Sequence, residues 1–235
     1  MRRIRHARVV VRTIILNAMN RKEKFVVSLN RELGTGGRTV GRKLAERLAV
    51  KYYDKAVIDG LTKEFGLTPE FIEELKGKKM SWWGQFCSYY NSAVTSSIPM
   101  EMEPLLTAES MMETEIRILQ ELASQESCVV AGRSGFFVFR SWPNHLSVFI
   151  RASMESRIAR LMEKRNMDRE EAIRTIEKVD KARENFTRKY ADASRYDTHN
   201  YDLVVNMDGL TEDDAADIIM AYIERLTANA EKKRS

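Results

Sequence analysis

The chain has 235 residues, of which 43% are hydrophobic, enough for one domain with a substantial buried core. The formal net charge of the chain is +5, and residues 1–24 alone carry +7, so residues 25–235 carry +5 − 7 = −2. Because the positive charge is concentrated in the first 24 residues, we expect no nucleic-acid partner. The two cysteines form no C-x-x-C pair and have no histidine cluster nearby, which excludes a zinc site and a disulfide framework and indicates a cytoplasmic location.

Residues 1–22 are interpreted as a basic N-terminal extension, and two explanations for it stay open. Arg12 interrupts its apolar run and no small-residue cleavage site follows, so a secretory signal is not indicated. Neither this stretch nor a later one is long and apolar enough to span a bilayer, and we expect no membrane partner. The extension is either a disordered tail or, because Met19 directly precedes the first strand pattern, untranslated. Without residues 1–18 the formal charge would be +5 − 5 = 0.

The next stretch has the order strand, glycine turn, helix. Residues 24–30 form an apolar run typical of a short buried strand, and residues 31–38 contain glycines at three positions. Apolar residues then recur at helical spacing across residues 40–48. This order places the turn at the start of a helix.

The rest of the chain alternates short apolar strands with amphipathic helices. Predicted strands lie at residues 52–54, 127–133, 145–150 and 202–206, and predicted helices begin at residues 54 and 68 and span 113–123, 153–164, 168–190 and 211–226. The alternation predicts an α/β fold with a mostly parallel sheet that is covered on both faces. Such sheets bind ligands at the carboxyl ends of their strands, so we expect the functional residues there.

A single domain is predicted for residues 23–228, followed by a charged tail at residues 229–235. Within the domain, residues from about 80 to 112 break the alternation and are interpreted as an insertion. Their aromatic side chains favour packing against the core, with stacking on a base as the other interpretation. These side chains are Trp82, Trp83, Phe86, Tyr89 and Tyr90.

The glycine turn is the most informative motif. A phosphate is held by backbone N–H groups that surround it at a helix N-terminus, and glycine allows the chain to curl tightly there. A tight turn without a ligand is the other interpretation. The predicted phosphate-binding residues are Gly34, Thr35, Gly36, Gly37, Arg38 and Thr39.

This turn departs from the usual P-loop pattern G-x-x-x-x-G-K-[ST] at two positions. Glu32 stands where the first glycine belongs, and Arg38 replaces the lysine. Arg38 would supply the positive charge, although arginine is not a simple substitute for lysine. Thr39 would offer its hydroxyl to Mg²⁺, or it is a plain helix residue.

Several segments together resemble the cytidylate kinase-like branch of the P-loop kinases. These are S-L-N-R-E-L-G-T-G-G-R-T-V-G-R-K-L-A-E-R-L followed by K-Y-Y-D-K, then V-V-A-G-R-S-G, E-K-V-D-K-A-R and H-N-Y-D-L-V-V-N. They span residues from about 24 to 226. The resemblance implies a three-layer α/β/α P-loop kinase fold with an acceptor-binding insertion and a helical lid at about residues 157–195.

The resemblance also implies ATP-dependent phosphoryl transfer, with Mg²⁺, to a nucleoside monophosphate such as CMP or dCMP. Arg133 matches the arginine that grips the acceptor phosphate. Asp180 and Arg183 match catalytic residues of the lid, and their spacing puts them on one helix face, where Asp180 would orient Arg183. A solvated ion pair is the other interpretation. The arginines at 157, 160, 165 and 188 would also be able to neutralise phosphates, but on such charged helices they are interpreted as surface residues.

Two departures from the family pattern keep other functions open. Classical cytidylate kinases have aspartates before and after the Gly-Arg pair, where this chain has Ala131 and Ser134. These departures and the missing lysine leave two alternatives: a P-loop kinase for another small acceptor, or a nucleotide-sensing module without turnover. The sequence does not decide between a monomer and a homodimer.

Overall fold

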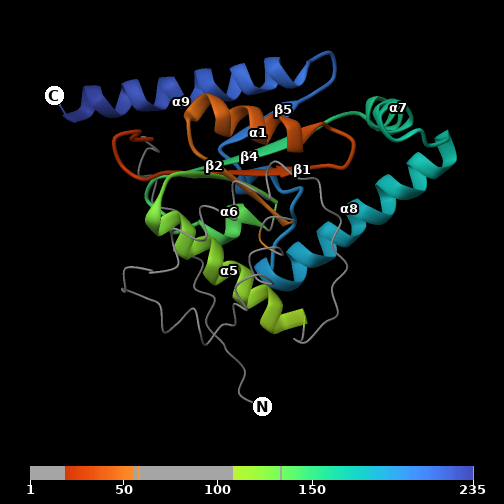
Figure 1. Cartoon of the computed structure of the whole chain (residues 1–235), viewed down its shortest axis with the longest axis horizontal. Coiled ribbons are helices and arrows are strands. Elements are labelled where there is room, and N and C mark those ends of the chain that lie inside the picture. The colour runs from red at the N-terminus through yellow and green to blue at the C-terminus, as the bar shows by residue number, and fades with distance from the viewer. Residues whose placement is uncertain (1–18, 56–57, 59–107, 133, 235) are drawn as a thin grey trace.

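The computed structural model describes residues 19–55, 58, 108–132 and 134–234, which form a sheet covered by helices (Figure 1). In chain order the elements are β1 (Val26–Arg31), α1 (Gly37–Leu48), β2 (Lys51–Asp54), α5 (Ala108–Gln125), β3 (Cys128–Ala131), α6 (Gly135–Val138), β4 (His145–Arg151), α7 (Met154–Arg165), α8 (Arg169–Ala191), a 3-10 helix (Thr198–Asn200), β5 (Leu203–Asn206) and α9 (Glu212–Arg234).

The sheet has five strands in the order β2-β3-β1-β4-β5. Every neighbouring pair is parallel, so the carboxyl ends of the strands meet at one edge. The register places Asp54 of β2 opposite Ala131 of β3, and Arg31 of β1 opposite Ile150 of β4. The predicted parallel sheet is confirmed, and its ligand-binding edge carries Arg31 and Asp54.

Helices cover both faces of the sheet and make three layers (Figure 1). On one face, Leu44 of α1 and Ile219 of α9 pack with Val27 of β1. On the other face, Leu119 of α5 packs with Val26 of β1. Neighbouring residues of β1 thus enter opposite layers, as the two-residue period of a strand requires. The sheet is buried between the layers and forms a rigid base for its carboxyl edge.

Helices α7 and α8 extend beyond the carboxyl edge of the sheet (Figure 1). α7 begins after Ser153, whose hydroxyl accepts a hydrogen bond from the N–H of Ser156 at 3.3 Å. α8 begins after Asp168, whose side chain accepts from the N–H of Glu171 at 2.7 Å and caps the helix. These caps fix where the two helices start.

The C-terminal helix is longer than predicted. α9 continues from Glu212 to Arg234, past the expected end at residue 226 and through most of the predicted charged tail. No glycine or proline stops it, and the alanine, lysine and glutamate residues that follow are strong helix formers. Within the described ranges, no helix has both the length and the apolar character that crossing a membrane requires.

The predicted N-terminal boundary is also wrong for residues 19–22. Met19 is 4% exposed and packs in the core beside α1 and α9. The N–H of Asn20 donates to Oδ1 of Asn144 at 3.0 Å, which attaches this segment to the turn before β4. Residues 19–22 therefore belong to the domain rather than to the extension.

Other predictions fall on residues that the structure does not describe. Residues 1–18, the helix expected after residue 68, the aromatic cluster of the insertion and Arg133 all lie outside the described ranges. Of the helix expected from residue 54, Asp54 lies at the end of β2, Lys55 and Ile58 are helical, and the rest is outside the described ranges.

We predict that truncation of two adjacent isoleucines of α9 changes the free energy of unfolding by very different amounts. Ile219 is fully buried, whereas Ile218 is 41% exposed. Ile219→Ala should lower the free energy of unfolding by about 2–5 kcal/mol, because it leaves a cavity in the core. Ile218→Ala should change it by no more than about 0.5 kcal/mol. Urea unfolding followed by circular dichroism measures both, and equal losses would contradict the assigned face of α9.

Candidate active site

The glycine loop joins β1 to α1 and leaves the start of the helix open. Gly36 is the N-cap, no side chain caps it, and the first turn of α1 contains no acidic residue. The N–H groups of a first helical turn have no partner within the helix, and the helix dipole adds positive potential there. This helix start can therefore bind an anion, as the sequence predicts.

A cavity of about 510 Å³ lies between this loop and α7, and we call it the loop cavity. Its lining residues are Arg31, Glu32, Leu33, Gly34, Gly36, Gly37, Arg38, Thr39, Arg160, Leu161, Lys164, Arg165, Arg183 and Glu212. Thr35 alone among the predicted phosphate-binding residues is absent from this lining. Thr35 is buried, and its hydroxyl donates to the carbonyl of Glu32 at 2.9 Å, so its side chain shapes the loop.

Helix α7 packs directly on the loop at Gly34. A Cβ atom at this position would lie 2.8 Å from the carbonyl oxygen of Arg157, and the φ of Gly34 is +86°. Both facts require glycine, because the obstructing atom belongs to a helix backbone that cannot step aside. The lid helix therefore touches the predicted phosphate loop in this structure.

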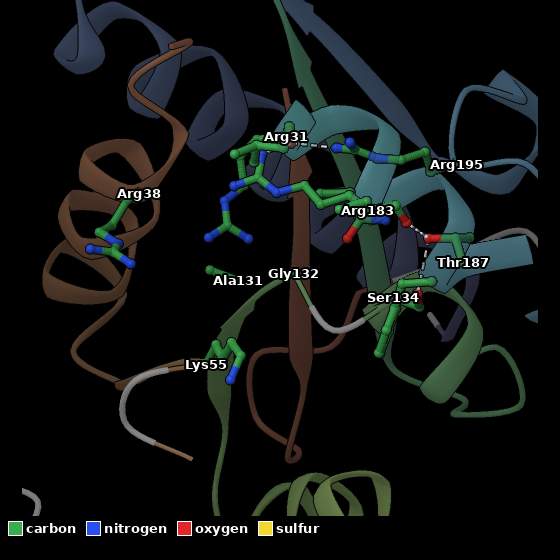
Figure 2. A pocket seen from close by; sticks show the side chains of 13 residues that line it. Arg31, Arg38, Lys55, Ala131, Gly132, Ser134, Arg183, Thr187 and Arg195 are labelled. Carbon is green, nitrogen blue, oxygen red and sulfur yellow. Dashed lines mark hydrogen bonds between the residues drawn. The ribbon is translucent and has the colours of Figure 1, made fainter. Parts of the chain in front are cut away.

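A second cavity of about 440 Å³ lies at the carboxyl ends of β1 and β3, and we call it the strand-end cavity (Figure 2). Its lining residues are Asn30, Arg31, Arg38, Lys55, Ala131, Gly132, Ser134, Val179, Ala182, Arg183, Phe186, Thr187 and Arg195. Five of these described lining residues are cationic and none is acidic. The cavity is therefore suited to a strongly anionic ligand.

The two cavities share Arg31, Arg38 and Arg183. These residues come from the end of β1, the first turn of α1 and the middle of α8. Figure 2 shows Arg38 on one side of the strand-end cavity and Arg31 with Arg183 on another. Three guanidinium groups from separate elements thus stand where a ligand of one cavity would meet a ligand of the other.

Asp180 of α8 holds the lid and the loop together. It is 6% exposed, and its Oδ1 accepts from the N–H of Leu33 at 3.0 Å. The same oxygen accepts from Arg183 and Arg195, each at 3.3 Å, and Oδ2 accepts from Arg157. The interpretation of Asp180 as part of a solvated ion pair is therefore excluded. Asp180 and Arg183 are in contact, as their spacing on one helix face predicts.

Arg183 is half-buried and surrounded by other cations. Its Nη1 donates to the carbonyl of Arg31 at 3.1 Å, and a guanidinium nitrogen of Arg195 donates to the same carbonyl. Burial, followed by the charges of Arg31 and Arg195, lowers the pKa of Arg183 to about 10. Arg183 keeps its proton at neutral pH, and a bound anion would relieve the repulsion that lowers its pKa.

Arg38 occupies the lysine position of the loop, but its side chain pairs with a carboxylate. Its Nε lies 3.2 Å from Oδ2 of Asp54, and the Arg38 side chain is 59% exposed whereas that of Asp54 is 2% exposed. Asp54 is paired in the sheet with Ala131, where the family pattern has an aspartate. The carboxylate of Asp54 therefore lies on the strand next to Ala131, the position at which this chain lacks the family's aspartate.

Hydroxyl groups line the strand-end cavity opposite Arg38. Oγ of Ser134 lies 3.2 Å from Oγ1 of Thr187, and Thr187 donates to the carbonyl of Arg183 at 3.0 Å (Figure 2). Ser134, noted in the sequence as a departure from the family pattern, thus contributes a hydroxyl to this cavity. Arg133, the predicted phosphate grip, lies outside the described residues.

Sequence reasoning missed several residues of this site. Arg31 gave a signal, since it ends a strand immediately before the glycine loop. Arg157, interpreted as a surface residue, is 6% exposed and also approaches Glu32 at 3.6 Å. Lys55 ends the quoted segment K-Y-Y-D-K but was given no role there, and Arg195 stands in no quoted segment, so only the fold brings Arg195 to the cavity. Arg160 and Arg165 line the loop cavity, whereas Arg188 is exposed as expected.

Comparison with known families and proteins places this site in context. A family model described as the cytidylate kinase-like family matches residues 26–209. A curated cytidylate kinase from Sulfolobus acidocaldarius is 30% identical over 112 residues, which are 47% of this chain and 60% of that protein. The match therefore spans less than two thirds of that relative.

Similar solved structures support the fold. An uncharacterized protein from Eubacterium ventriosum superposes with a TM-score of 0.65 at 22% identity, covering 86% of this chain and 99% of that one. A gluconokinase from Sinorhizobium meliloti superposes with a TM-score of 0.50 at 14% identity, covering 90% and 98%. The predicted three-layer α/β/α fold of the P-loop kinases is confirmed.

We predict that Asp180→Asn lowers the free energy of unfolding by about 3–5 kcal/mol, because it leaves buried guanidinium groups without their counter-ion. Glu177→Gln is the matched control, since Glu177 is exposed on the same helix and its change should cost under about 0.5 kcal/mol. Urea unfolding measures the loss, and limited proteolysis should cut α8 faster in Asp180→Asn alone. Equal stability of the two variants would contradict the role given to Asp180.

Proposed function

The chain belongs to the cytidylate kinase-like family, and from this premise we propose that it transfers the terminal phosphoryl group of ATP to a nucleoside monophosphate, with CMP or dCMP as the acceptor. The observation that carries the proposal is the set of three arginines shared by the two cavities. Phosphoryl transfer is catalysed by positioning and by cations around the group in transit, and this arrangement provides both.

The loop cavity is proposed to hold the phosphates of ATP. The uncapped start of α1 offers backbone N–H groups, and Lys164 and Arg165 of α7 add positive charge on the facing wall. Together they favour a polyphosphate over a neutral ligand. Residues 34–39 would contact it through the backbone, with Thr35 stabilising the loop from inside.

The loop can accommodate the Mg²⁺ that accompanies ATP. Thr39 lies exposed in the first turn of α1 and lines the loop cavity. From this position its hydroxyl would be able to bind Mg²⁺. Among the described residues, no group of three or more His, Cys, Asp and Glu could hold a metal ion. Thr39 would therefore hold the ion from the protein side, and the ion would supply positive charge that offsets the charge of the phosphates.

The strand-end cavity is proposed to hold the acceptor. Its cationic lining favours an acceptor that carries a phosphate, and the hydroxyls of Ser134 and Thr187 offer hydrogen bonds. Arg133, which follows this strand in the sequence, is proposed to grip that phosphate. An oxygen of the acceptor phosphate would attack the terminal phosphorus of ATP. The bond between that phosphorus and the oxygen that bridges it to the rest of ATP would break, and ADP would leave.

Closure of α7 and α8 over the loop would keep water from the transferred group. Asp180 links both helices to the loop through Arg157, Arg183 and Leu33. Exclusion of water strengthens the electrostatic contacts and prevents hydrolysis of ATP. The same contacts hold Arg183, which lines both cavities, and we propose that it acts as a catalytic residue there.

The test is ADP formation from Mg²⁺-ATP with CMP, dCMP, UMP, AMP, GMP or gluconate as the acceptor. We expect turnover with CMP or dCMP. Arg183→Met should lower kcat by about 10²–10³, because one cation is lost from the transfer site. Arg188→Met is the matched control, since Arg188 lies on the same helix with a 66% exposed side chain. Arg133→Ala should raise the KM for the acceptor.

Other results would point to the alternatives. Turnover with gluconate but with no nucleotide would assign a different acceptor. ATP binding without ADP formation from any acceptor would favour a nucleotide sensor. Equal activity of the variants Arg183→Met and Arg188→Met would remove Arg183 from the transfer site.

A further inference from the structure

The side chain of Arg31 is held across the carboxyl edge of the sheet. Its Nη1 would lie 2.4 Å from a Cβ atom at Gly132, so the guanidinium passes over the end of β3. On the other side, a Cβ at Gly37 would lie 2.7 Å from the Cβ of Arg31. Glycines at both positions make room for this one arginine, and its guanidinium lines both cavities.

Arg31 differs from the arginines around it in its counter-ions. Arg38 pairs with Asp54, and Arg183 and Arg195 both pair with Asp180. No carboxylate among the described residues lies within ion-pair distance of the Arg31 side chain. Burial lowers the pKa of Arg31, Tyr52 and Asp54 act in the opposite direction, and the charges of Arg38 and Arg195 lower it further. A partly buried guanidinium with no carboxylate of the described residues in direct contact is stabilised by an anion that binds beside it.

The lysine position of the loop does not offer an equivalent free cation. Arg38 is drawn toward Asp54 at the end of β2, where its charge is partly neutralised. Figure 2 shows Arg31 and Arg38 approaching the same cavity from different sides. Of these two, only Arg38 is in direct contact with the carboxylate of Asp54, so the guanidinium of Arg31 is the more available to a ligand.

We propose that Arg31 is a catalytic residue that binds the phosphoryl group while it passes from donor to acceptor, the task performed by the P-loop lysine in the usual pattern. The proposal rests on the proposed kinase function. A planar guanidinium presents parallel N–H donors that match two oxygens of a phosphoryl group. Because arginine keeps its proton, Arg31 would act through charge and hydrogen bonds alone.

The structure separates this role from a role in folding. The structural contacts of Arg31 use its backbone carbonyl, which accepts from Arg183 and Arg195. Substitution of the side chain leaves that carbonyl in place. It also removes a partly buried charge that pairs with no carboxylate of the described residues, so stability should be unchanged or higher rather than lower.

The experiment compares Arg31→Met and Arg31→Lys with Arg174→Met, an exposed arginine on α8. Calorimetry measures the binding of Mg²⁺-tripolyphosphate, and ADP formation with CMP measures kcat and KM. Arg31→Met should weaken tripolyphosphate binding at least about 10-fold and lower kcat by about 10²–10³ with Tm unchanged or raised. Arg31→Lys should recover part of both, and Arg174→Met should match the unchanged protein.

The two readouts distinguish failure of this inference from failure of the proposed function. If the unchanged protein forms no ADP with any acceptor, the kinase proposal fails, and tripolyphosphate binding alone then decides whether Arg31 is an anion site. Equal tripolyphosphate affinity and kcat in Arg31→Met and Arg174→Met would overturn the inference. If Arg31→Met does not fold, Arg31→Gln takes its place, because it removes the charge but keeps a polar side chain: tripolyphosphate affinity and kcat equal to those of Arg174→Met would overturn the inference.

Discussion

The site depends on one buried carboxylate that must be shared among several cations. Among the described residues, Asp180 pairs with Arg157, Arg183 and Arg195 and accepts the N–H of Leu33, and Glu32 also approaches Arg157 at 3.6 Å. These two carboxylates face three guanidinium groups, and the charge of Arg31 adds to them, so the cluster retains excess positive charge. The same contacts that fasten α7 and α8 to the glycine loop therefore create the electrostatic demand for an anionic ligand.

This arrangement links stability with ligand binding. Arg31 and Arg183 are partly removed from water, and burial lowers the pKa of each. Like charges held close together destabilise the empty protein, and phosphate groups would offset that repulsion. Ligand binding would thus be favoured by relief of the repulsion between these arginines, as well as by new hydrogen bonds. A polyphosphate and a phosphate-bearing acceptor would each reduce part of the excess charge.

Much of the fold follows from local sequence pattern, whereas the site depends on long-range placement. The two-residue and helical periods locate the strands of the sheet and α1, α7 and α8, because each buries one face. The glycine loop is visible because a phosphate turn needs glycine. Arg195 and Asp54, however, reach the cavities only through the order of the strands and the path after α8, which no local pattern encodes. Arg157 was misjudged because a charged helix gives no sign that one of its arginines is buried.

The passage of Arg31 over Gly132 makes the placement of the cation depend on this glycine. The backbone of Gly132 has a φ of +85°, and any side chain there would collide with the guanidinium. The guanidinium is the flexible end of a long side chain and can move aside, whereas the left-handed backbone of Gly132 disfavours any side chain whatever the space around it. A shorter residue at position 31 would therefore not release position 132 from glycine, and a side chain at position 132 would displace the cation as well as strain the backbone.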